Sequence, residues 1–250
     1  IAAARYFTKF PTGIPNRRRA LPPFMVLGAT AGLIAVEPDM GTAAVMVAAM
    51  MIYFHIAGMK LRQLAAAASV GLLGAAVMIW RHPYQLDRLK GWLFRTDLPL
   101  EEGYQATQSL IALGSGGLTG RGYSKSVWKY FYLPAANTDS ILPVIGEELG
   151  LIATWTVLAL FMLLVWRGLT VAGRSPDRFS GLVAAGVACL IGVQALLNIA
   201  VATDSLPSTG VPLPFVSYGG SSLVLSLMGV GLLLNVSRNQ VRRTAPAEGQ

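Results

Sequence analysis

The chain has 250 residues, of which 54% are hydrophobic and 13% charged, and its mean hydropathy is +0.54. A soluble domain usually carries about a quarter charged residues, so this composition excludes a water-soluble globular protein and predicts a polytopic α-helical membrane protein. The net charge of +8 does not indicate a nucleic-acid partner, because the Lys and Arg residues lie in short runs between apolar segments, as orienting charges do.

Six apolar segments follow one another, at residues 22–36, 42–57, 64–80, 141–166, 179–202 and 222–236. A spanning helix needs about 20 apolar residues, so the first two segments are short, and the sequence EPDMGT separates them. Residues 1–7 resemble the end of an earlier apolar segment, and we expect further residues to precede Ile1; no signal peptide is recognisable. Cys189, the single cysteine, is expected to be a small core residue of the fifth segment.

The basic residues predict the orientation of these segments. Thirteen of the 20 Lys and Arg lie at the ends and in the short loops of one side, whereas the other seven lie in the long loop 81–140, where charge has little influence. We therefore expect one transmembrane domain over residues 1–240, with loop 81–140 external and residues 241–250 as a disordered cytoplasmic tail. Ten of the 12 Asp and Glu lie on the external side, which indicates a site at the outer leaflet.

The EPDMGT turn places Glu37 and Asp39 at the external end of the first two segments. Two acids beside apolar helices suggest a basic partner, and the candidates are Arg88, Lys90 and Lys129 in the long loop.

Within the long loop, GYQATQSLIALGSGGLTG (103–120) has the apolar periodicity of an amphipathic helix that a Gly-rich turn ends. Its apolar face is expected to lie on the helix bundle or in the membrane interface. A packed surface helix without a functional role explains the same periodicity.

Asp139 lies two residues before the apolar run of the fourth segment. Partial desolvation makes a carboxylate at the membrane boundary a better proton acceptor, which suits a general base. Asn137, Thr138 and Asp139 are also residue types that cap helices, so N-capping is the alternative. Glu147 and Glu148 follow about two turns into the same helix, with Glu147 on roughly the face of Asp139; acids in such positions line a polar cavity or meet a cation.

The last external loop reads SLPSTGVPLPFVSYGGSS (205–222), and its three prolines predict a stiff, extended backbone. Gly219 and Gly220 open the sixth segment, whose first N–H groups can hold an anion such as phosphate. The loop lacks the Lys of a Walker motif, no His or Cys has metal-ligand spacing, and the only histidines are His55 and His82.

These motifs, together with the Arg88 region, KYFYLPAANTD and GEELG, occur in the order typical of the SEDS family of peptidoglycan glycosyltransferases (FtsW-, RodA- and SpoVE-like), which the chain resembles over residues 5–240. The resemblance implies an all-α transmembrane bundle of ten helices, whose C-terminal six match the six spans here. This sequence departs from the family pattern at Ser140, where Phe is common, and at Asp204, where Gly is common.

The resemblance also implies a reaction: polymerisation of lipid II, an undecaprenyl-linked disaccharide peptide, at the outer face of the bacterial cytoplasmic membrane, with undecaprenyl pyrophosphate as the leaving group. Asp139 matches the essential aspartate of the family, so we assign it the role of base. Arg88 and Lys129 match basic positions that hold pyrophosphate. The other candidates for substrate binding are Gln105, Gln108, Ser109, Thr138, Tyr218 and Ser221, and the candidate cavity acids are Glu37, Asp39, Glu147 and Glu148.

No cofactor is demanded by the sequence, although a divalent cation (Mg²⁺ or Mn²⁺) between acids is compatible with it. The FPTG stretch and the GSGGLTGRG and KYFYLP motifs resemble the division (FtsW-like) branch, which implies septal cell-wall synthesis with a class B penicillin-binding protein transpeptidase and other divisome proteins as partners. A flippase for the lipid-linked precursor is the main alternative, and a non-catalytic scaffold for division proteins is a third.

Overall fold

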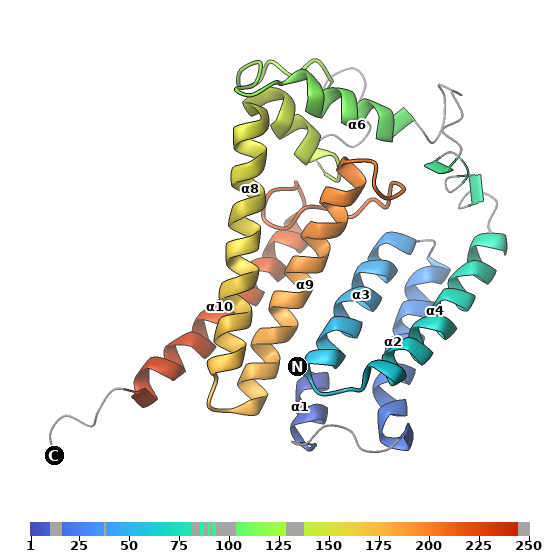
Figure 1. Ribbon diagram of the computed structural model, residues 1–250, viewed down its shortest axis with the longest axis vertical. Helices are drawn as coiled ribbons and strands as arrows, with labels where there is room; N and C mark the ends of the chain where they lie inside the picture. Colours follow the sequence, from blue (N-terminus) through green and yellow to red (C-terminus); the bar gives the residue numbers. More distant parts are fainter. Residues whose placement is uncertain are drawn as a thin grey trace, which may run out of the picture.

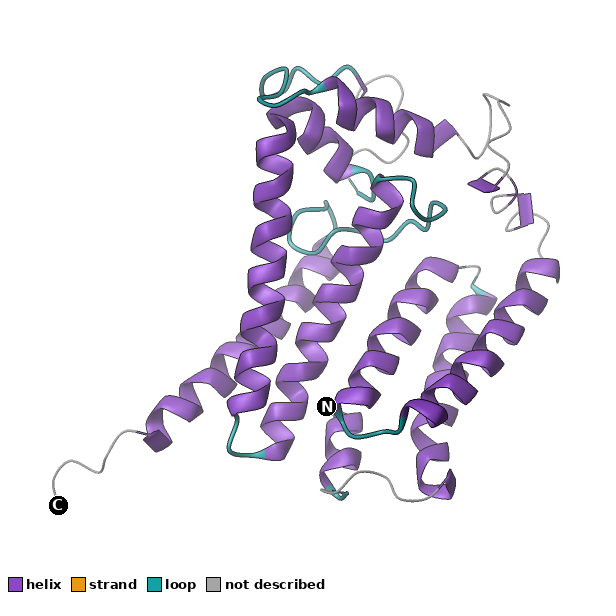
Figure 2. Ribbon diagram, in the orientation of Figure 1, coloured by secondary structure: helices purple, strands orange, loops and turns teal. Residues whose placement is uncertain are grey.

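The computed structural model describes residues 1–10, 17–37, 39–81, 86–87, 90, 92–93, 104–128 and 138–244. Within these ranges every regular element is a helix (Figures 1 and 2). The helices are α1 (Ala2–Thr8), α2 (Arg17–Val36), α3 (Met40–Ile56), α4 (Leu61–Arg81), α6 (Tyr104–Ser115), α8 (Ile141–Arg174), α9 (Arg178–Ala202) and α10 (Gly220–Thr244).

Five of these helices, α2, α4, α8, α9 and α10, are long and apolar enough to cross a membrane, and α3 is a shorter apolar helix of 17 residues. They correspond to the six predicted apolar segments, which confirms an all-α multi-pass membrane protein. Helix α10 continues to Thr244, so residues 241–244, expected in the disordered tail, are helical, while 245–250 lie outside the described residues.

Helix α2 tolerates two prolines because another helix supplies a missing donor. Pro22 and Pro23 lie inside α2, and Pro23 has no N–H for the carbonyl of Arg19 four residues earlier. The hydroxyl of Tyr6, on α1, donates to that carbonyl instead at 2.7 Å. The hydrogen bond ties α1 to the start of α2.

The helices form two groups that meet where α3 packs on α9 (Figure 1). In the first group, α1 to α4, the aromatic side chains of Phe7, Tyr53 and Phe54 are buried together. In the second group, α8 to α10, small residues allow close approach: Gly168 on α8 faces Ala188 on α9 so closely that a Cβ at Gly168 would lie 2.9 Å from the alanine methyl group.

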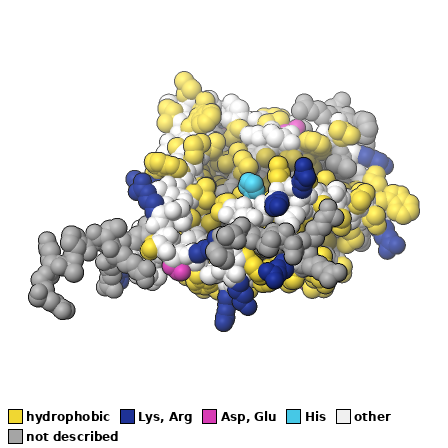
Figure 3. Space-filling view, turned by 60° about the horizontal axis from the view of Figure 1, so that its bottom comes forward, with side chains coloured by type: hydrophobic (Ala, Val, Ile, Leu, Met, Phe, Trp, Pro, Cys, Tyr) yellow, Lys and Arg dark blue, Asp and Glu magenta, His cyan; other side chains and the backbone are white. Residues whose placement is uncertain are grey.

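The two ends of the molecule differ in chemistry. At the upper end of Figure 1, α6 lies across the start of α8, and the loop between α9 and α10 folds beneath them. Figure 3 brings the lower end forward and shows mainly Lys and Arg among its charged side chains. The turns and helix ends on that side carry Lys60, Arg62, Arg174 and Arg178.

Candidate functional site

Helix α8 is broken near its start, and the break creates the platform for the site. Gly150 has φ 80° and ψ −175°, so residues 141–149 form a short arm and residues 151–174 the membrane-crossing helix. The predicted apolar segment at 141–166 lies within α8, and the break at Gly150 was not expected from the sequence. The short arm runs beside α6 at the upper end of the molecule (Figure 1).

The turn after α6 bonds the backbone groups that the break releases. The N–H groups of Leu151 and Ile152 donate to the carbonyls of Gly117 (3.0 Å) and Leu118 (3.3 Å) instead of to the preceding helical turn. The carbonyls of Glu147 and Glu148 accept from the N–H groups of residues 121 (2.9 Å) and 122 (3.0 Å). A break at membrane depth is stable only when such groups find new partners, so the turn and the short arm form one unit.

Glu147 holds the same turn through its side chain. It is 0% exposed, and its carboxylate accepts hydrogen bonds from the Val127 N–H (3.0 Å), the Ser126 hydroxyl and the Arg121 guanidinium (3.4 Å). Of the two expected environments, a polar cavity or a cation, the structure gives Glu147 the cation. Arg121 and Ser126 were not among the predicted site residues, and no local pattern distinguishes them from other loop residues.

Glu148 is buried differently. It is 7% exposed, and its Oε1 atom accepts no hydrogen bond from any residue that the structure describes. A buried carboxylate oxygen without a donor is costly, and in this Glu148 differs from Glu147, whose carboxylate accepts three hydrogen bonds.

Asp139 lies in the turn at residues 138–140 that leads into the short arm. The N-cap of α8 is Ser140, so the alternative that Asp139 caps the helix is excluded. The half-buried carboxylate of Asp139 accepts from the Gln105 amide at 3.4 Å and from the Thr138 hydroxyl at 3.1 Å. Gln105 also donates to the Ser140 hydroxyl at 3.1 Å. The structure therefore brings together three predicted site residues, Gln105, Thr138 and Asp139.

The loop between α9 and α10 folds back to this turn. Val211, Leu213 and Pro214 are buried although they belong to no helix. The hydroxyl of Ser217 accepts from the Leu213 N–H at 2.7 Å and donates to the carbonyl of Thr138. The predicted stiff loop is thus a re-entrant segment whose middle contacts the Asp139 turn.

Other predicted binding residues are dispersed around Asp139. Ser109 is buried on α6, and the Oε1 atom of Gln108 is buried without a hydrogen-bond donor among the described residues. Tyr218 is 83% exposed and Ser221 is exposed, so both lie at the open surface near the start of α10. Arg88 and Lys129 lie outside the described residues.

The acids of the EPDMGT turn are placed at the surface. Asp39 is the N-cap of α3 and accepts from the Thr42 N–H at 3.0 Å, and Glu37 is exposed. Lys90, a predicted partner of these acids, instead lies 4.0 Å from Asp87. Asp39 thus begins α3, Glu37 is exposed, and the role of the two residues as cavity acids stays a prediction.

The EPDMGT turn nevertheless contacts the re-entrant loop. A Cβ at Gly41 would collide with the carbonyl oxygen of Thr209, so only glycine permits this approach between the two segments. The re-entrant loop starts after α9 with Asp204, whose φ of 53° lies in the left-handed region. This conformation explains why glycine is common at that family position.

No group of three or more His, Cys, Asp and Glu able to hold a metal occurs in the described part of the chain. The expected divalent cation therefore stays a prediction.

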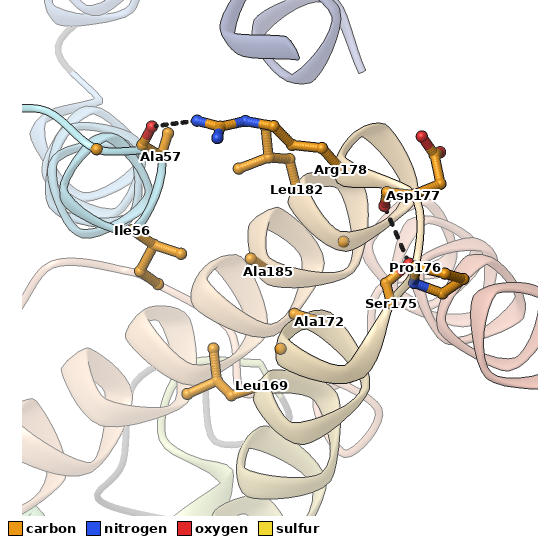
Figure 4. A pocket seen from close by; sticks show the side chains of 13 residues that line it. Ile56, Ala57, Leu169, Ala172, Ser175, Pro176, Asp177, Arg178, Leu182 and Ala185 are labelled. Carbon is orange, nitrogen blue, oxygen red and sulfur yellow. Dashed lines mark hydrogen bonds between the residues drawn. The ribbon is translucent and has the colours of Figure 1, made fainter. Parts of the chain in front are cut away.

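A hollow of about 870 Å³ lies at the opposite, basic end, between the end of α3 and the α8–α9 turn (Figure 4). There the Arg178 guanidinium donates to the Ala57 carbonyl at 3.2 Å, and the Ser175 hydroxyl donates to the Asp177 carbonyl at 3.0 Å. None of the predicted site residues lines this hollow, so it is separate from the Asp139 site.

Comparison with known proteins identifies the family. Residues 1–242 match the family model of the FtsW, RodA and SpoVE proteins, described as cell cycle proteins. The chain is 40% identical to stage V sporulation protein E of Bacillus subtilis, covering 94% of this chain and 64% of that protein. It is 42% identical to a protein of Halomonas elongata named "Probable peptidoglycan glycosyltransferase FtsW", covering 98% of this chain and 63% of the relative.

Solved structures share the fold. A chain of a peptidoglycan synthase complex superposes with a TM-score of 0.75 at 26% identity, covering 96% of this chain and 67% of that one. The rod shape determining protein RodA of Thermus thermophilus superposes with a TM-score of 0.63 at 26% identity, covering 96% of this chain and 62% of RodA. The chain spans about 60% of the length of the curated relatives it matches. These matches confirm the resemblance read from the motifs, and the chain belongs to the FtsW, RodA and SpoVE family of cell cycle proteins.

Proposed function

We propose that the protein is a peptidoglycan glycosyltransferase that polymerises lipid II into glycan strands. The observation that carries the proposal is the Asp139 carboxylate, half-buried at the end of the bundle and held by Gln105 and Thr138 without capping a helix. The names of the relatives, several of which are called probable peptidoglycan glycosyltransferases, support the same reaction class.

In the proposed reaction the acceptor sugar hydroxyl attacks the anomeric carbon of the donor. Asp139 takes the hydroxyl proton, the bond from the anomeric carbon to the pyrophosphate oxygen breaks, and undecaprenyl pyrophosphate leaves with the electron pair. Each oxygen of Asp139 accepts one hydrogen bond in the structure, whereas a carboxylate has about four acceptor sites, so capacity remains for the substrate hydroxyl.

The remaining binding roles are part of the proposal. Arg88 and Lys129 would neutralise the pyrophosphate charge, as cations do in phosphate recognition. Gln108, Ser109, Thr138, Tyr218 and Ser221 would contact the sugars or the phosphates. A divalent cation (Mg²⁺ or Mn²⁺) between acids stays part of the proposal, although the described residues contain no group of three acidic, His or Cys ligands for it.

We propose that the Asp139 end faces the outside of the bacterial cytoplasmic membrane, with loop 81–140 external and the C-terminus cytoplasmic. The basic residues of the opposite end support this orientation through the positive-inside rule (Figure 3). A lipid-linked disaccharide exposed at the outer leaflet would then reach Asp139.

We also propose that the protein acts in septal cell-wall synthesis with a class B penicillin-binding protein transpeptidase and other divisome proteins. The FtsW names of several relatives support the division branch. The similarity to a chain of a peptidoglycan synthase complex, described as coordinating polymerization and crosslinking, supports a transpeptidase partner.

The test is lipid II polymerisation by the full-length protein in detergent, comparing wild type, Asp139→Asn and Asp87→Asn. Loss of a general base costs about 10²- to 10⁴-fold in rate, so Asp139→Asn should fall by that factor. Asp87→Asn, which removes an exposed acid of the same side, should match wild type.

Each alternative predicts a different result. Polymerisation by Asp139→Asn at the wild-type rate would exclude the base role. A flippase would form no glycan but would move lipid II across liposomes, and a non-catalytic scaffold would support growth of cells that carry Asp139→Asn.

A further inference from the structure

Two amide side chains on one face of α9 bond the re-entrant loop. Gln194 and Asn198 are four residues apart, one helical turn, and so lie on the same face. The Gln194 amide donates to the Pro212 carbonyl at 3.0 Å, and the Asn198 amide donates to the Val211 carbonyl at 2.8 Å. These carbonyls belong to buried or partly buried backbone outside any helix, which needs hydrogen-bond donors from elsewhere in the fold.

Asn198 makes one contact that Gln194 does not. Its amide nitrogen also donates to the carbonyl of Asp139 at 2.8 Å, and Asn198 is only 1% exposed. One buried nitrogen, with its two hydrogens, therefore joins the Asp139 turn to Val211 in the re-entrant loop.

We propose that Asn198 is a positioning residue that sets where the Asp139 carboxylate lies relative to the re-entrant loop. The inference rests on the proposed function, because it assigns a role to Asn198 through Asp139. No capping hydrogen bond from the Ser140 side chain holds the turn at residues 138–140. Its two successive carbonyls are held instead by Ser217 and Asn198.

The expected consequence is kinetic. An aspartate side chain has only two rotatable bonds, so fixing its backbone confines its carboxylate. Misplacement of a catalytic group by about 1 Å can cost about 100-fold in rate. Removing Asn198 should lower kcat while KM changes little, because a base acts in the transition state and Gln194 still holds the loop.

The experiment compares Asn198→Ala with Gln194→Ala in the full-length protein, using lipid II polymerisation in detergent. We expect Asn198→Ala to lower kcat about 10- to 100-fold with KM within about 3-fold of wild type, and Gln194→Ala to keep kcat within about 3-fold. Asn198→Asp retains the size of the side chain but loses the paired N–H donors, and it should lower kcat as much as Asn198→Ala does. This variant separates the lost hydrogen bonds from a packing defect.

Hydrogen exchange gives a result that does not depend on activity. Asn198→Ala should increase amide exchange at residues 138–141, whereas Gln194→Ala should increase it only around 211–213. Equal kinetic losses in the two alanine variants, a change confined to KM, or unchanged exchange at 138–141 would each overturn the role of Asn198. If the wild type still polymerises lipid II in those cases, only the role of Asn198 is contradicted. If the wild type forms no glycan, the proposed function itself is contradicted.

Discussion

Asp139 and Glu147 are acids eight residues apart that the structure uses in opposite ways. Asp139 is half-buried and keeps acceptor capacity for a substrate. Glu147 is fully buried, and its carboxylate accepts from Arg121, Ser126 and Val127. Acidity near this end of the molecule therefore does not by itself indicate a role, because the two carboxylates differ in how many of their acceptor sites are occupied.

Replacing Glu147 or Glu148 by glutamine, one at a time, should change the stability of the protein by different amounts. In Glu147→Gln the amide N–H₂ group must face one donor, either the Ser126 hydroxyl or the Val127 N–H, and the ion pair with the half-exposed Arg121 is lost. We expect the free energy of unfolding to fall on the order of 3 kcal/mol. Glu148→Gln removes a buried charge whose Oε1 has no donor in the described structure, so it should change stability much less. Thermal melting of the full-length variants checks both, and equal melting temperatures would contradict the assignment.

At the scale of elements, the break in α8 depends on close backbone contact with the turn after α6. A Cβ at Gly120 would collide with the carbonyl of Glu148 and approach the Gly150 nitrogen, and a Cβ at Gly150 would collide with Gly120 and Leu118. Two glycines on facing segments let the freed carbonyls and N–H groups pair across the break. The short arm, and with it the Asp139 turn, is oriented by this contact.

A pair of alanine substitutions tests the contact. Gly117 and Gly120 both have positive φ, 57° and 79°, but a Cβ at Gly117 meets no atom within 4 Å. Gly117→Ala should lower the free energy of unfolding by about 1–2 kcal/mol, because alanine is strained in the left-handed conformation. Gly120→Ala should cost more and should also lower polymerisation, since the short arm must shift. Equal melting temperatures for the two variants would show that the backbone contact does not hold the arm.

At the scale of the molecule, the helices separate a polar end from a basic end. At the polar end, the re-entrant loop contacts both the Asp139 turn and the EPDMGT turn (Figure 1). The basic end carries Lys60 and Arg178, at the turns and helix ends of that side (Figure 3). This separation agrees with the proposed reaction on a lipid-linked substrate of one leaflet.

Thiol labelling checks the orientation. In a Cys189→Ala background, Tyr123→Cys in the turn after α6 and Lys60→Cys between α3 and α4 both place a thiol at an exposed site. A membrane-impermeant maleimide added to intact spheroplasts should label Tyr123→Cys and not Lys60→Cys. The reverse pattern would contradict an external Asp139, and labelling of both after lysis is the control.

The sequence by itself determined the membrane class, the six apolar segments and the family. Hydropathy over about 20 residues is a local property, because each spanning helix satisfies its own backbone hydrogen bonds. The order of the motifs and the position of Asp139 before an apolar run could also be read without coordinates. The amides of Gln194 and Asn198 in a spanning helix are a further signal in the sequence, since polar residues there usually have a specific partner.

Only the tertiary structure decided how the acids and amides are paired. The hydrogen bonds that define the site join Asp139 to residues 34 and 59 positions away, and no local pattern encodes such a distance. The sequence likewise does not show that Gly150 breaks α8 or that Asp39 only caps α3, because a glycine or an aspartate permits several conformations and partners. Packing of α6, α9 and the re-entrant loop selects one of them, since buried polar groups must find donors or acceptors wherever the fold places them.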